Sequence, residues 1–69
     1  MKLSARNVLA ARVLKVTHGA VESEILLELA PGLQLVSTIT KASAEGLGLK
    51  EGGSAMAIIK ASNVIIGVD

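Results

Sequence analysis

Apolar and polar residues alternate most clearly between positions 20 and 30. The odd positions from Val21 to Leu29 carry aliphatic side chains or a serine, whereas Glu22, Glu24 and Glu28 occupy even positions. Successive side chains of a strand point to opposite faces of a sheet. The segment therefore predicts a half-buried strand whose glutamates form a solvated face rather than a pair of acid–base carboxylates.

Two further strands flank this segment. Residues 8–18 are rich in β-branched and aliphatic side chains, and Gly19 predicts a turn after them. Residues 31–32 are Pro-Gly, which predicts a second turn because proline presets its φ angle and glycine accepts a positive one. Residues 33–40 alternate again. The first 40 residues therefore predict three consecutive strands joined by short turns.

The pattern changes after Thr40, which we expect to cap a short helix over residues 41–47. Glycines at 46 and 48 favour its end. Two glycines at 52 and 53 predict another turn, followed by strands over residues 54–60 and 64–68. These last two apolar runs are continuous, which is typical of strands buried on both faces. In so short a chain, the second face is most simply covered by another subunit.

The expected order is three strands, one short helix and two strands. This is the order of a small OB-type barrel. We therefore predict an all-β fold with one short helix: a five-stranded OB-like barrel with the helix between strands 3 and 4. Residues 1–69 would form one domain.

Composition adds an expectation of self-assembly. A chain of 69 residues has room for one small core and is marginally stable alone. It contains no cysteine, so disulfides and thiolate metal sites are excluded, and one histidine cannot form an imidazole cluster. Yet 51% of its residues are hydrophobic, and none is aromatic. So much aliphatic surface predicts a homo-oligomer.

Charge and hydropathy narrow the choice of partners. The formal net charge of +1 gives no strong field for nucleic acid or an anionic membrane. No apolar run approaches the roughly 18 residues of a membrane span, and the N-terminus has no apolar leader core. We therefore expect a cytoplasmic protein without nucleic-acid or membrane partners.

Two clusters of hydrogen-bond donors lie near the two ends of the chain. Residues 4–7 are Ser-Ala-Arg-Asn, and residues 60–62 are Lys-Ala-Ser. Small hydroxyls beside a cation suit a small anion better than a base, a peptide or a metal. Two plainer readings stay open at this point. Arg6 could form a surface ion pair at a solvated strand start, and Lys60 could extend from an apolar strand into solvent.

A third group of donors surrounds the predicted helix start. Thr40 and Ser43 place two hydroxyls at a helix N-terminus, which attracts anions, although on these residues alone plain capping by Thr40 is slightly favoured. His18 is expected to be an exposed turn residue with no serine or cysteine nucleophile arranged around it. No phosphate loop or hydrolase motif is present. We therefore expect no enzyme activity.

Three motifs together resemble the molbindin (Mop) family of molybdate-binding proteins over essentially the whole chain. Residues 1–7 (MKLSARN) resemble its Ser-Ala-Arg-Asn motif, residues 47–52 (LGLKEG) its Leu-Gly-Leu turn, and residues 59–62 (IKAS) its closing lysine motif. The chain departs from the family at Val8, where glutamine is frequent, and at Ala11, where glycine is common. These departures leave every proposed donor in place and affect only the packing beside it.

The resemblance implies a molybdate or tungstate ligand held between subunits of a hexamer, without a cofactor, a directly bound metal or catalysis. The implied oxyanion-binding residues are Ser4 and Arg6 of one chain together with a set from its neighbour: Thr40, Ser43, Lys60, Ala61 and Ser62. The expected role is storage or homeostasis of molybdenum.

Two alternatives stay open on the sequence. The chain could be an accessory module of a molybdate transporter or regulator, or a small OB-type nucleic-acid-binding protein. The second alternative requires aromatic side chains on which bases stack, and the chain has none.

Overall fold

The computed structural model describes all residues, 1–69, and confirms a mostly β fold with one short α-helix. A single helical turn, η1, follows the last strand. The elements are β1 (Asn7–His18), β2 (Glu22–Ala30), β3 (Leu33–Thr40), α1 (Lys41–Gly46), β4 (Ser54–Ile59) and η1 (Ala61–Asn63). The third strand has the predicted bounds, and the other elements up to β4 differ from the prediction by one or two residues at an end.

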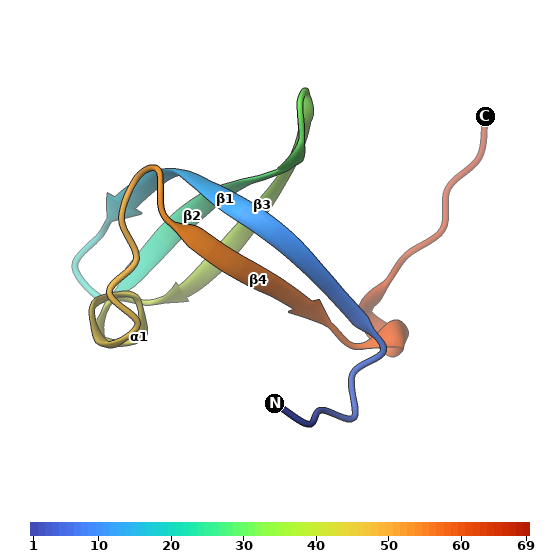
Figure 1. Ribbon diagram of the computed structural model, residues 1–69, viewed down its shortest axis with the longest axis horizontal. Coiled ribbons are helices and arrows are strands. Elements are labelled where there is room, and N and C mark those ends of the chain that lie inside the picture. The colour runs from blue at the N-terminus through green and yellow to red at the C-terminus, as the bar shows by residue number, and fades with distance from the viewer.

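The four strands form one antiparallel sheet in the order β3-β2-β1-β4. Figure 1 shows the sheet curling so that α1 lies at one end of it and η1 at the other. The turn between β1 and β2 requires a glycine, since a Cβ at Gly19 would lie 2.9 Å from the Glu22 carbonyl oxygen. The turn before β3 uses Gly32 at φ 80°, which glycine adopts without strain.

The long strand β1 pairs with two other strands. Its first half, from Asn7 to Arg12, pairs with β4, and its second half pairs with β2. The register shifts between Val13 and Lys15, which is a β-bulge. A bulge bends its strand and increases the local twist. This bend lets β1 turn from one partner to the other and curls the sheet.

The core lies inside this curl. Its buried side chains come from three strands and the helix: Val13, Ile25, Leu27, Ala44 and Ala57. The predicted alternation along β2 is confirmed for Ser23, Ile25 and Leu27, which are buried, whereas Val21 lies in the turn and is exposed. Ala44 of α1 is only 1% exposed, so the helix closes one end of the core. No helix in the structure has the length and apolar character needed to cross a membrane.

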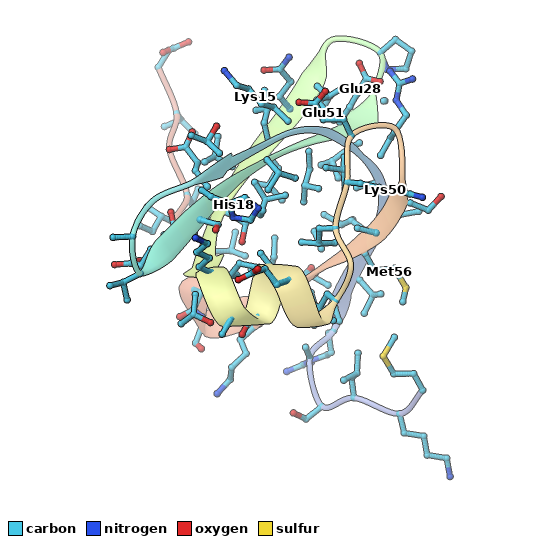
Figure 2. The ribbon with its side chains drawn as sticks, turned by 90° about the vertical axis from the view of Figure 1, so that its left-hand side faces the viewer. Lys15, His18, Glu28, Lys50, Glu51 and Met56 are labelled. Carbon is cyan, nitrogen blue, oxygen red and sulfur yellow. The ribbon has the colours of Figure 1, made fainter.

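One face of β4 is turned to the core and the other is exposed in the single chain, where we expect another subunit to cover it. Ala57 is buried and Ala55 and Ile59 are half-buried, whereas Met56 and Ile58 on the other face are exposed. Figure 2 shows Met56 pointing away from the inside of the curled sheet. A single chain of this size has no second layer to place over that face.

The fifth strand predicted over residues 64–68 is absent, and the closed five-stranded barrel is not confirmed. The chain after η1 has no strand pairing, and Ile65 and Val68 are each 93% exposed. Figure 1 shows this segment running away from the sheet. Strand character in the sequence gives a pairing potential, but a strand forms only where an edge is available beside it. The sheet is therefore open, with β3 and β4 as its two edges.

Candidate oxyanion-binding site

The antiparallel pairing of β1 with β4 brings the two terminal motifs together. The pairing begins with Asn7 opposite Ile59. The side-chain amide of Asn7 also donates a hydrogen bond to the Ile59 carbonyl oxygen, at 3.1 Å. Because the strands are antiparallel, the residues before Asn7 and those after Ile59 continue side by side. Sequence positions more than 50 residues apart thereby form one site.

These flanking residues line a small surface pocket of about 210 Å³. Its lining consists of Ser4, Ala5, Arg6, Lys60, Ala61 and Ser62. The pocket thus has two cationic side chains, two hydroxyls and no carboxylate. We call it the terminal pocket. Its chemistry is that of a hydrogen-bond donor set with positive charge, which suits an anion.

The helical turn η1 holds the second half of the terminal pocket in place. Asn63 N–H donates to the Lys60 carbonyl oxygen at 2.9 Å, and Val64 N–H donates to the Ala61 carbonyl oxygen at 3.2 Å. The first N–H groups of a helical turn have no acceptor within the turn. The backbone of Ala61 and Ser62 therefore adds donors to the side chains around it.

The two cations of the terminal pocket are not neutralised within the chain. The single salt bridge joins Arg12 to Glu28, at 3.0 Å. Arg6 and Lys60 are exposed and form no ion pair. Two like charges on neighbouring segments repel each other, and a bound anion would relieve that repulsion.

Five of the expected site residues lie together in the single chain, and how they are shared between chains stays a prediction. The resemblance implies that Lys60, Ala61 and Ser62 come from a neighbour of the chain that supplies Ser4 and Arg6. In the structure all five line one pocket of one chain. The physical reason is the β1–β4 pairing, which no local sequence pattern reveals.

Thr40 and Ser43 do not join the terminal pocket. Thr40 caps α1: its Oγ1 accepts a hydrogen bond from Ser43 N–H at 3.1 Å and lies 2.8 Å from Ser43 Oγ. Figure 1 places α1 and η1 at opposite ends of the curled sheet. Within one chain, the two hydroxyls therefore act as the helix cap.

His18 has a partner that the sequence did not indicate. Its Nδ1 lies 2.6 Å from Ser23 Oγ, and the two residues are paired across β1 and β2. The sequence predicts no serine or cysteine nucleophile around this histidine, and strand pairing does place one serine, Ser23, beside it. Ser23 is only 1% exposed, so its hydroxyl is unavailable to a substrate, and the contact gives a buried polar group its partner.

Known proteins share both the sequence and the fold. Residues 3–66 match the TOBE domain family. Molybdenum-pterin-binding protein 3 of Clostridium pasteurianum is 44% identical over 66 residues, which cover 96% of this chain and 97% of that protein.

Two solved structures align closely. One is a molybdate-binding protein from Sporomusa ovata, at 34% identity and a TM-score of 0.92, with 99% of this chain and 100% of that one covered. The other is the cytoplasmic molybdate-binding protein ModG with molybdate bound, at 49% identity and a TM-score of 0.94. The alignment with ModG covers 100% of this chain and 49% of the ModG chain. With the Ser-Ala-Arg-Asn motif and the closing Lys-Ala-Ser motif beside each other in one pocket, the chain is a TOBE domain of the molbindin (Mop) family.

Proposed function

We propose that this protein binds molybdate in the terminal pocket and holds it without catalysis, as a store or buffer of molybdenum. The observation that carries the proposal is the lining of that pocket: two cations and two hydroxyls, with no carboxylate. The names of the relatives support the same ligand, since ModG and the Sporomusa protein are described as molybdate-binding. The proposed ligand-binding residues are Ser4, Arg6, Lys60, Ala61 and Ser62.

The chemistry of the pocket favours molybdate among common oxyanions. Molybdate is a tetrahedral dianion whose four oxygens all accept hydrogen bonds near neutral pH. Phosphate is partly protonated at that pH, and its O–H would lack an acceptor in a pocket that offers only donors. A buried group left without a partner costs about 1–3 kcal/mol. Sulfate is smaller and would contact the lining imperfectly, whereas tungstate matches molybdate in charge and size.

The proposal extends to assembly and location. We propose a homo-oligomer, a hexamer as the resemblance implies, in the cytoplasm, where ModG is described. In it, Thr40 and Ser43 would reach an anion only from a neighbouring copy, since they lie outside the terminal pocket of their own chain. The exposed apolar side chains of Val8, Met56 and Ile58 support burial against another copy.

The proposal is tested by the thermal midpoint of unfolding in the presence of different anions. Molybdate and tungstate should raise the midpoint to a similar extent, sulfate less and phosphate least. A ligand at 100 times its dissociation constant stabilises the folded state by about 2.7 kcal/mol per site. Chloride at matched ionic strength is the control. Equal shifts for all four oxyanions would indicate a general salt effect and contradict a shaped site.

A further inference from the structure

Asn7 completes the Ser-Ala-Arg-Asn motif, yet the proposed binding of molybdate gives its side chain no role. Asn7 does not line the terminal pocket. Its side chain is half-buried, and Nδ2 donates to the Ile59 carbonyl oxygen at 3.1 Å. Of the five side-chain hydrogen bonds in the chain, this is the one that joins the two terminal motifs. Asn7 therefore connects the motifs but lies outside the pocket that they form.

This hydrogen bond joins the backbone positions from which the two cations of the pocket extend. Asn7 directly follows Arg6, and the Ile59 carbonyl belongs to the same planar peptide group as the Lys60 nitrogen. One hydrogen bond thus ties the residue after one cation to the peptide group before the other. Figure 1 shows the start of β1 and η1 meeting at the same end of the sheet. The relative position of the Arg6 and Lys60 backbones therefore depends on this bond.

Beyond the last strand pair, no other hydrogen bond joins the two sides of the terminal pocket. Strand pairing stops at Asn7 and Ile59. No backbone hydrogen bond outside the helices and strands involves residues 1–6, and η1 is bonded within itself and has no side-chain cap. Arg6 and Lys60 repel each other in the absence of an anion. Without the Asn7 amide, the two sides would be freer to move apart.

We propose that Asn7 is a positioning residue for the anion, whose amide holds Lys60 and Arg6 across the terminal pocket before the ligand binds. The inference rests on the proposed binding of molybdate in this pocket and adds what keeps the pocket in shape. Donors that are already in place lose less conformational freedom when a ligand binds, which raises the affinity.

A double-mutant cycle with Lys60 tests whether the amide acts through the pocket. Asn7→Ala removes the hydrogen bond and leaves every donor of the pocket in place. It should weaken molybdate binding about 2- to 13-fold, the range that corresponds to the net contribution of one neutral hydrogen bond. In the Lys60→Ala background the same change should have a smaller effect, because the cation that it positions is gone. Isothermal titration measures all four proteins where circular dichroism and sedimentation show them folded and assembled.

A disulfide in place of the hydrogen bond tests the same role even if Asn7→Ala does not fold. The chain has no cysteine, and Asn7 lies directly opposite Ile59. Directly opposed residues of antiparallel strands lie about 4.5–5.5 Å apart at Cα, a separation that a disulfide can span. In a chain with Asn7→Cys and Ile59→Cys, oxidation should strengthen molybdate binding about 2- to 13-fold over the reduced form.

The control disulfide joins the same two strands further from the pocket. Ala11 and Ala55 are also directly opposed and half-buried. In a chain with Ala11→Cys and Ala55→Cys, oxidation should raise the thermal midpoint but leave the dissociation constant for molybdate unchanged. A general gain in stability would appear with both disulfides, whereas a gain in affinity should appear only with the one beside the pocket.

The outcomes separate this inference from the proposed function. A parent that does not bind molybdate, or a Lys60→Ala variant that binds like the parent, would overturn both. If Lys60→Ala binds more weakly but Asn7→Ala binds like the parent, only the positioning role is wrong. The same conclusion follows if Asn7→Ala weakens binding by an equal factor in both backgrounds, or if the two disulfides change the affinity equally or not at all.

Discussion

The tripeptide Lys-Ala-Ser occurs twice in this chain, at residues 41–43 and 60–62, and the two copies have different surroundings. The first copy starts α1 directly after the extended Thr40, whereas in the second copy Lys60 is itself the extended residue that precedes η1. At the first copy, Ser43 is bonded through its N–H and its hydroxyl to Thr40. At the second copy, no side-chain cap is present, and Ser4 and Arg6 lie across the same pocket.

The comparison shows that composition alone does not make an anion site. At residues 41–43 the N–H groups of Lys41 and Ser43 donate to the Val21 carbonyl oxygen and to Thr40 Oγ1, and no second cationic motif lines a pocket with them. At residues 60–62 the pairing of β1 with β4 brings in the second motif, residues 4–6, and the donors of both motifs line the terminal pocket. The difference between the two copies can be tested by the same substitution at each.

The largest effect is expected at Lys60, the lysine of the second copy. Lys60→Ala should weaken molybdate binding about 10- to 150-fold, because a charge-assisted hydrogen bond contributes roughly 1.5–3 kcal/mol. Lys41→Ala, the matched control, should leave the dissociation constant unchanged. Isothermal titration measures both, after circular dichroism and sedimentation show that fold and assembly are intact. If Lys60→Ala binds like the parent, the terminal pocket is not the site.

A smaller effect on stability is expected at the first copy. Thr40→Ala removes the cap of α1 and should lower the free energy of unfolding by about 0.5–2 kcal/mol. A loss of 1 kcal/mol corresponds to a fall of about 4–8 °C in the thermal midpoint of a domain this small. Thermal unfolding followed by circular dichroism measures it, and an unchanged midpoint would contradict the capping role.

The same variant sharpens the comparison through its affinity for molybdate. The affinity is measured at a temperature well below the thermal midpoint of the variant. A twofold or larger loss of affinity in an intact oligomer would mean that Thr40 of a neighbouring copy contacts the anion. An unchanged affinity would limit the first Lys-Ala-Ser copy to its structural role.

The smallest effect is expected from a neutral donor of the terminal pocket. Ser4→Ala should weaken molybdate binding about 2- to 13-fold, because a neutral hydrogen bond contributes about 0.5–1.5 kcal/mol. Ser54→Ala, an exposed serine at the start of β4, is the control and should bind like the parent. Titration at constant ionic strength measures both. A loss as large as that of Lys60→Ala would point to a rearranged pocket rather than one lost hydroxyl.

Most of the fold could be predicted because its signals are local. The alternation along β2 needs only a period of two residues, the turn at Pro31-Gly32 only the preferences of those two residues, and the cap at Thr40 only its neighbours. The surroundings of the last two predicted strands were harder to predict, because a continuous apolar run indicates burial but does not indicate which part of the protein covers it. Residues 64–68 therefore have the composition of a strand but no partner in the single chain.

By itself, the sequence determined which donors could hold an anion and which family the motifs resemble. Only the tertiary structure decided which of these donors share one pocket. The Asn7–Ile59 pair joins segments 52 residues apart, and His18 meets Ser23 in the same way, across two strands. Local propensities act over a few residues, whereas strand pairing is selected by the packing of the whole sheet, and this is why the pocket could not be assembled from the sequence.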